Sequence, residues 1–241
     1  MKTNARTLLI LVPLILAATG SLLLFGVFRP DLVETLLPFS MTGNAFVDGK
    51  LKYQFVTLAV ALALLAVTFL LEGKNSKMFY RAGKLDAPAE PLGWMGIKSN
   101  DTWKGVGINF AVIVSIATAV FVYLNVFRGQ TLEPQHVRFL PIVLVLAVMN
   151  AFTEEAITRL SVVTALHGKL SNEAITIASG LLFGIPHYFG VPGGIIGSLM
   201  AGFLGWLLAK SILETKGFAW AWFIHFLQDV IIITAMFWAA L

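Results

Sequence analysis

Seven long apolar runs constrain this chain more than any other feature of its sequence. An α-helix needs roughly 20 apolar residues to cross about 30 Å of hydrocarbon. Because the fifth run is short, and because residues 32–46 could be interfacial or re-entrant, we expect about seven membrane helices, within a range of six to eight. The runs cover residues 7–28, 53–71, 106–127, 139–160 (with an extension to 166), 174–189, 195–213 and 218–241.

The composition favours a membrane protein for the same physical reason. Of the 241 residues, 58% are hydrophobic and 12% are charged, about half the charged fraction of an ordinary soluble chain. So few charges would not cover the surface of a soluble fold of this size, whereas a bilayer needs no such cover. The predicted fold class is therefore all-α, a polytopic transmembrane helical bundle.

Cysteine and net charge exclude further classes of site and partner. The chain has no cysteine, which excludes disulfides, thiolate metal ligands and a cysteine nucleophile. The net charge of +4 fits an excess of Lys and Arg in cytoplasmic loops. We expect no nucleic-acid partner, because no basic stripe follows a polar helix.

The distribution of Lys and Arg predicts the orientation. We interpret residues 7–28 as a retained helix rather than a cleaved signal, which gives seven spans with a cytoplasmic N-terminus. We expect an integral protein of a prokaryotic plasma membrane. Eleven basic residues then face the cytoplasm and five face outward, as the positive-inside rule requires. The inner set is Lys2, Arg6, Lys74, Lys77, Arg81, Lys84, Lys98, Lys104, Lys169, Lys210 and Lys216, and the outer set is Arg29, Lys50, Lys52, Arg128 and Arg138.

Ionisable residues gather in three of the last four predicted helices. A charge at the centre of a membrane helix costs about 2.5–3.5 kcal/mol on insertion scales, so a group of them requires a reason. We expect these side chains to converge on a polar cavity in helices four to seven. They are Glu154, Glu155 and Arg159 in the fourth helix, His187 in the fifth, and His225 and Asp229 in the seventh.

The spacing of these residues supports convergence. Glu155 and Arg159 are four residues apart, so they share a helix face and can pair. Glu154 lies about 100° away on the same helix and, without a charged partner at i+3 or i+4, is a candidate general base. Phe183 precedes His187 by one turn, and Pro186 should bend the helix beside it.

Structural roles remain open for several of these residues. The pair of Glu155 and Arg159 could simply stabilise the fourth helix, and a histidine within the membrane could be an interhelical hydrogen-bond donor. Asp229 could act only by fixing the tautomer of His225, four residues before it. A separate row of small residues (Gly193, Gly197, Ala201 and Gly205) indicates close helix packing, more than a substrate groove.

Three motifs taken in order resemble a known family. Glu154-Glu155-x-x-x-Arg159, Phe183-x-x-x-His187 and His225-x-x-x-Asp229 are similar to the motifs of the CPBP (ABI) family, which includes the type II CAAX prenyl endopeptidases and the bacteriocin-processing and self-immunity proteins. We expect a single membrane domain over residues 1–241. The resemblance covers about residues 139–229 and implies a catalytic core at 139–241. Residues 1–138 would be variable N-terminal helices with a cytoplasmic loop at about 72–104.

The resemblance also implies roles for the individual residues. Glu154 and His187 would activate a water molecule for attack on a peptide carbonyl, while His225 and Asp229 would hold the oxyanion. Glu155, Arg159 and Phe183 would support them. The last motif position is commonly Asn in the prenyl endopeptidases, and an ionised Asp229 would repel an oxyanion, so that role is in doubt for this residue.

The predicted function is therefore an intramembrane endopeptidase of glutamate type that acts on a peptide or lipidated-protein substrate near membrane lipid. CAAX-type and leader-peptide processing are both compatible with it. Such proteins have been described as metalloproteases, but no tight ligand spacing indicates zinc, and we expect no cofactor. The alternatives are a non-catalytic membrane immunity or binding protein and a proton-coupled transporter, in which buried Glu, His and Asp also occur.

Overall fold

The protein folds as an all-α polytopic bundle, which confirms the predicted fold class. The computed structural model describes residues 2–128, 134–191 and 193–240, so the two end residues of the predicted domain lie outside the described residues. The elements in chain order are α1 (Lys2–Leu23), π-helix η1 (Leu24–Phe28), α2 (Pro30–Leu36), α3 (Ala45–Leu71), α4 (Gly73–Phe79), 3₁₀-helix η2 (Gly93–Met95), α5 (Trp103–Val122), π-helix η3 (Tyr123–Phe127), 3₁₀-helix η4 (Pro134–Phe139), α6 (Leu140–Glu155), π-helix η5 (Ala156–Leu160), α7 (Ser161–Leu166), α8 (Asn172–Gly184), 3₁₀-helix η6 (Pro186–Phe189), α9 (Gly194–Thr215) and α10 (Ala219–Ala240).

Among the described residues, six helices are long and apolar enough to cross a membrane, the lower limit of the predicted range. The difference from seven arises at the predicted fifth helix, residues 174–189. There α8 ends at Gly184, and a 3₁₀ turn begins at Pro186, because proline lacks the N–H that would continue the helix. The six spans are Arg6–Phe28, Ala45–Leu71, Trp103–Phe127, Val137–Leu166, Gly194–Thr215 and Ala219–Ala240.

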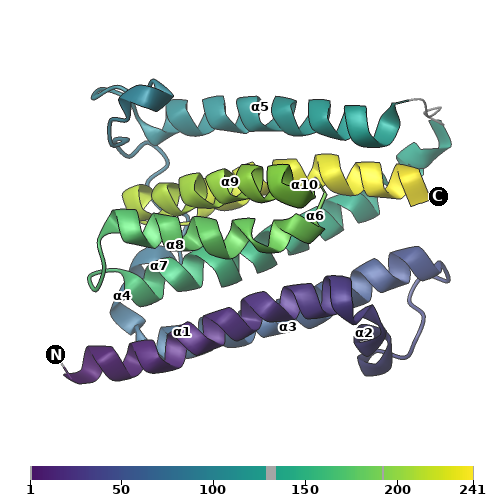
Figure 1. Ribbon diagram of the computed structural model, residues 1–241, viewed down its shortest axis with the longest axis horizontal. Coiled ribbons are helices and arrows are strands. Elements are labelled where there is room, and N and C mark those ends of the chain that lie inside the picture. Colours follow the sequence, from purple (N-terminus) through teal and green to yellow (C-terminus); the bar gives the residue numbers. More distant parts are fainter. Residues whose placement is uncertain (1, 129–133, 192, 241) are drawn as a thin grey trace.

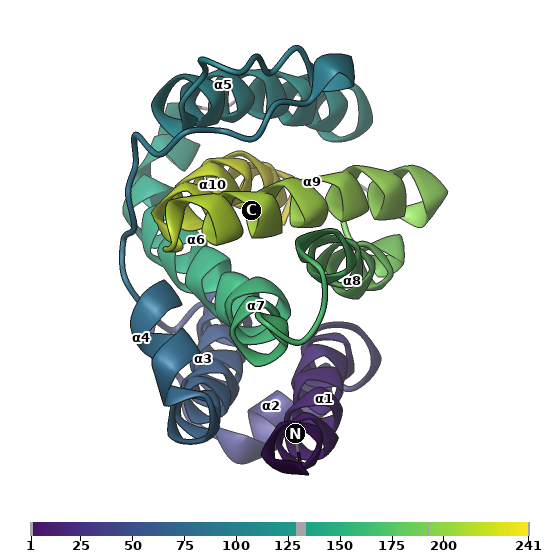
Figure 2. The same cartoon turned by 90° about the vertical axis from the view of Figure 1, so that its left-hand side faces the viewer.

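The helices form three groups that lie side by side (Figures 1 and 2). α1 and α3 pack together on one side, α6 to α10 occupy the middle, and α5 covers the opposite side against α10. α3 and α6 run in the same direction. Their contacts show this, because Leu51 shares a cluster with Leu146, Gln54 bonds to Asn150, and the chain just after α3 reaches the end of α7.

The loop between α3 and α5 is fastened to the end of α9. Glu214 accepts hydrogen bonds from the Trp103 ring Nε1 at 2.7 Å and from the backbone N–H of Glu90 at 3.0 Å. Lys210 forms an ion pair with the same glutamate one turn earlier on α9. The loop therefore packs against the end of α9.

The ends of the bundle separate the two sets of basic residues. Figure 1 shows the N-terminus, α4 and the turn between α7 and α8 at one end, and α2 and the C-terminus at the other. The residues counted as cytoplasmic belong to elements at the first end, and those counted as outer belong to the second. The fold thus keeps the charge asymmetry on which the predicted orientation depends.

Glycines let α8 and α9 cross with their backbones in contact. A Cβ added to Gly184 would lie 2.7 Å from the Ser198 carbonyl oxygen and 2.8 Å from Gly202 Cα. A Cβ added to Gly205 would lie 2.9 Å from Phe183 Cβ. The packing interpretation of the small residues is therefore confirmed at Gly205. The crossing also fixes the position of Phe183 near the end of α8.

We expect Gly184→Ala to destabilise the protein, because the new methyl group meets backbone that has no rotamer to change. Overpacking of this kind costs about 1–3 kcal/mol. The measurement is thermal unfolding of the purified protein in detergent. Gly20→Ala on α1 is the matched control, since nothing lies within 4 Å of its added Cβ. Equal melting temperatures for the two variants would contradict the close crossing.

Candidate active site

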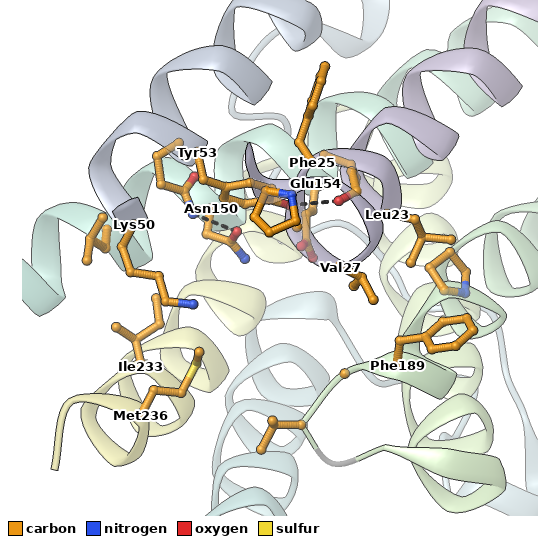
Figure 3. Close-up of a pocket in the computed structure, with 18 of the residues that line it drawn as sticks. Leu23, Phe25, Val27, Lys50, Tyr53, Asn150, Glu154, Phe189, Ile233 and Met236 are labelled. Carbon is orange, nitrogen blue, oxygen red and sulfur yellow. Dashed lines mark hydrogen bonds between the residues drawn. The ribbon is translucent and has the colours of Figure 1, made fainter. Parts of the chain in front are cut away.

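A cavity of about 710 Å³ lies between the N-terminal helices and the middle group of the bundle. Its walls come from α1, η1, α2 and α3 on one side and from α6, α8, η6 and α10 on the other. Figure 3 shows Glu154 inside this pocket, with Phe25 and Val27 of η1 to one side and Asn150 and Tyr53 to the other. A cavity therefore exists where the predicted ionisable residues gather, but its lining is mostly apolar, and the N-terminal helices form about half of its wall.

A buried ion pair lies beneath the cavity floor. Arg159 and Glu155 are 0% and 1% exposed, and their side chains pair across one helical turn, with Arg159 Nε 2.5 Å from Glu155 Oε1. His225 Nδ1 lies 2.8 Å from the same carboxylate oxygen. The same nitrogen lies 3.0 Å from Arg159 Nη2, so His225 Nδ1 meets both members of the ion pair. This contact joins α6 to α10 and fixes the ring of His225.

Phe183 is the centre of the aromatic contacts in the site. The Arg159 guanidinium lies over its ring, 3.8 Å from the centroid. The His187 ring is 4.2 Å away and the His225 ring 5.3 Å away, between centroids. A cation over an aromatic face is attractive, so Phe183 positions both histidines against Arg159.

Glu154 points away from this ion pair, as its place on the helix predicts. Its side chain is 15% exposed and lines the cavity, with Oε2 3.4 Å from His225 Nε2. Its backbone carbonyl accepts a hydrogen bond from Thr158 Oγ1 at 2.7 Å. Adjacent glutamates therefore occupy different environments, one against a guanidinium and one in the cavity.

His187 lies in η6, the 3₁₀ turn that Pro186 begins. Its Nδ1 is 2.7 Å from the Phe183 carbonyl oxygen, so Nδ1 is the donor and the other nitrogen is left with a lone pair. The turn places His187 in the wall of the cavity that contains Glu154. The predicted bend at Pro186 thus occurs, and the Phe183 carbonyl sets the tautomer of the histidine.

Asp229 connects to two residues that the sequence analysis missed. Its Oδ1 lies 3.6 Å from His225 Nε2, and its Oδ2 accepts a hydrogen bond from Asn150 Nδ2 at 3.2 Å. The Asn150 side-chain oxygen in turn accepts from Gln54 Nε2 on α3 at 2.8 Å. Asn150 precedes Glu154 by four residues, and that spacing is the signal that could have identified it.

A π-helical turn follows the two glutamates directly. η5 interrupts the long helix between α6 and α7, and Ser161 Oγ donates to the Ala156 carbonyl oxygen at 2.7 Å, five residues back. Single π turns inside α-helices occur frequently at functional sites. Arg159 belongs to this turn, and its Nη1 donates to Thr158 Oγ1 at 2.9 Å.

The structure brings together all seven residues that the motifs selected. Helix length alone would place His187 and His225 at different depths, yet both rings contact Phe183. Within the described part of the chain, no group of three His, Cys, Asp or Glu side chains has the arrangement of a metal site.

The two glutamates should differ in their effect on stability, which is testable. We expect Glu155→Gln to lower the free energy of unfolding by about 3–5 kcal/mol, because Arg159 would remain buried without a counter-charge. Glu154→Gln should change it by less than about 1 kcal/mol, since the amide stays in the cavity. Unfolding of both variants in the same detergent measures the difference. Equal losses of unfolding free energy in the two variants would show that the ion pair of Glu155 and Arg159 does not stabilise the fold more than Glu154 does.

Comparison with known families agrees with the geometry of the site. Residues 136–240, less than half of the chain, match the family model described as Type II CAAX prenyl endopeptidase Rce1-like. No curated protein and no solved structure matches the chain. The matched range contains Glu154, Glu155, Arg159, Phe183, His187, His225 and Asp229. This match confirms the resemblance of the C-terminal region to the CPBP family and, with the six apolar helices, supports an integral membrane protease.

Proposed function

We propose that the protein is an intramembrane endopeptidase in which Glu154 and His187 activate a water molecule. The observation that carries this proposal is that Glu154 and His187 line one cavity, while the neighbouring Glu155 is occupied by Arg159. A carboxylate that is free of a guanidinium partner can accept a proton from water. The family match supports peptide hydrolysis as the reaction.

The proposed reaction follows from the atoms that face the cavity. Glu154 takes one proton from the water, and His187, with a lone pair on its second nitrogen, accepts a hydrogen bond from the same molecule. The water oxygen attacks the carbonyl carbon of the peptide bond. The carbon–nitrogen bond then breaks, and the proton held by Glu154 passes to the leaving amine. The second proton of the water stays on the acyl product, so the products are a carboxylic acid and an amine.

His225 and Asn150 are the donors that we assign to the oxyanion. His225 Nε2 lies between the carboxylates of Glu154 and Asp229, at 3.4 and 3.6 Å, and in our assignment an N–H on this nitrogen donates to the oxyanion. Asn150 lines the cavity and has a second amide hydrogen besides the one it donates to Asp229. In this assignment Asp229 orients the two donors and does not itself meet the oxyanion.

The substrate that we propose is a peptide segment with an attached lipid, such as a prenylated CAAX tail. The cavity volume lies within the range of sites for small organic ligands, and most of its lining residues are apolar. An apolar cavity between membrane helices suits a lipid chain beside a peptide. We also assign the N-terminal end of the bundle to the cytoplasm, on the charge asymmetry described above.

Glu154→Gln should abolish cleavage of prenylated peptides by the purified protein. Loss of a general base lowers the rate by about 10²–10⁴-fold. The measurement is hydrolysis of a library of lipidated and unlipidated peptides in detergent, with and without a chelator. We expect the activity of the wild-type protein to resist the chelator, because Glu154 supplies the base without a metal.

Two outcomes would contradict this mechanism. Loss of wild-type cleavage to the chelator, restored by zinc, would establish a metal-dependent reaction. The absence of cleavage across the library, with thermal unfolding showing a folded protein, would favour the binding or transport alternatives. Proton-coupled uptake into liposomes then separates transport from a non-catalytic immunity protein.

Asp229→Asn should retain activity within about tenfold of the wild type, because asparagine can still accept the hydrogen bond from Asn150. Asp229→Leu removes that acceptor and should lower kcat by about 10²-fold or more. Steady-state kinetics on one prenylated peptide measure both variants. Equal loss in the two would show that the charge of Asp229, rather than its hydrogen bond, is required.

A further inference from the structure

The active-site cavity lies toward one end of the bundle, the end that carries α2 and the C-terminus in Figure 1. Its walls include η1, α2, the first turns of α3 and the last turns of α10, and they end toward the middle of the bundle at Glu154 and Thr158. None of the described residues that line it belongs to α4, α7 or the loop between α4 and α5. We call the end with α2 the open end, and the opposite end, which carries α4, the closed end.

Exposed charges show that water reaches the open end. Asp31 and Glu34 line the cavity, and their side chains are 60% and 53% exposed. A hydrogen bond from Arg29 holds the pKa of Asp31 below its ordinary value, so this carboxylate is ionised at neutral pH. Burying an ionised carboxylate away from water is costly. The cavity therefore meets the aqueous phase at the open end.

Packed side chains separate the active site from water at the closed end. Asn75 of α4 donates from Nδ2 to the backbone carbonyl oxygens of Thr164 and His167, at 3.1 Å each, and so holds α4 across the end of α7. Leu11 of α1 and Val163 of α7 belong to one hydrophobic cluster and are both 0% exposed. A peptide that approached from the closed end would have to displace this cluster to reach the cavity.

The closed end carries most of the basic residues. The connection between α3 and α5 holds five of them and the connection between η1 and α3 holds one. The five are Lys74, Lys77, Arg81, Lys84 and Lys98, and the one is Arg29. An excess of Lys and Arg marks the cytoplasmic side of a membrane protein. We therefore assign the closed end to the cytoplasm and the open end to the outer side.

We propose that the active site opens on the outer face of the membrane, and that the substrate is a membrane-anchored or lipidated peptide whose scissile bond is presented on that face. Cleavage of such a peptide rests on the proposed function, whereas the side on which the cavity opens does not. The proposal favours peptides that have crossed the bilayer over tails that remain in the cytoplasm. Both ends of the bundle are accessible in detergent, so a prenylated peptide remains a suitable substrate for testing the chemistry there.

The absence of cysteine from the chain makes the side of the open end directly measurable. Three single-cysteine variants are compared: Asp31→Cys at the mouth of the cavity, Met236→Cys inside it (Figure 3), and Asn100→Cys in the exposed loop at the closed end. In spheroplasts of a bacterial host, a small membrane-impermeant thiol reagent should modify the first two. It should modify Asn100→Cys only after detergent opens the membrane, and thermal unfolding checks that each variant is folded.

Three labelling results would overturn the proposal. Modification of Asn100→Cys in sealed spheroplasts, with Asp31→Cys protected, would place the open end in the cytoplasm. Modification of both would show that the protein inserts in two orientations. Modification of Asp31→Cys without Met236→Cys would show that the cavity is closed to water on the outer face.

Cleavage in sealed vesicles tests the substrate. A quenched fluorescent peptide with a lipid anchor and charged residues beside the scissile bond is added to right-side-out and to inverted vesicles, because charged side chains keep it on the side of addition. The wild-type protein should cleave it in right-side-out vesicles and should lose most of this cleavage in inverted ones until detergent is added. Vesicles with Glu154→Gln give the background rate.

The two measurements distinguish failure of this inference from failure of the proposed function. Cleavage confined to inverted vesicles would overturn the inference and leave the proposed function intact. Absence of cleavage in both kinds of vesicle and in detergent, with Met236→Cys modified from outside, would reject the protease and retain the outward-facing cavity.

Discussion

The buried guanidinium of Arg159 is the charge on which the rest of the site depends. In a membrane bundle it requires a carboxylate, and Glu155 supplies one with almost no exposure. The same carboxylate holds His225, while the Phe183 ring lies over the guanidinium and meets both histidines. One cation thus organises groups from three segments of the chain. These contacts hold Oε1 of Glu155. The 100° step of the helix turns Glu154 toward the cavity and so separates a structural carboxylate from a candidate base.

Close backbone packing then places the second histidine at this centre. The crossing of α8 and α9 depends on glycines whose added Cβ atoms would meet backbone, and it fixes Phe183 at the end of α8. Pro186 ends the helix, and the following 3₁₀ turn brings His187 back over the Phe183 ring. A straight continuation would carry the histidine past the other catalytic candidates. Because α8 is short, His187 of η6 can join Glu154 of α6 and His225 of α10.

The sequence predicted the features that are unusual in an apolar background. The charged residues and the proline stood out because each is costly or disruptive in a membrane helix, and the pair of Arg159 and Glu155 was found for that reason. Phe183 was found by its place one turn before His187. Gln54 and Asn150 carry no charge, so a search for ionisable groups passed over them, although both bond toward Asp229. The π turn η5 left no signal in the residue pattern. The start of α3 was placed at 53 rather than Ala45 because the polar side chains before it are satisfied by partners that are distant in sequence, as when Lys52 pairs with Glu34.

The division of the chain at about residue 136 separates the proposed catalytic groups from about half of the cavity wall. The matched region holds every residue assigned to water activation, yet about half of the cavity wall comes from α1, η1, α2 and α3, which lie outside that region. Gln54 connects the two parts, because its bond to Asn150 sets α3 in register with α6. Residues one turn away on α3 are therefore held in register with Glu154 on α6. Because this wall can change without disturbing the ion pair of Arg159, we expect substrate differences among related proteins to reside mainly in the N-terminal helices.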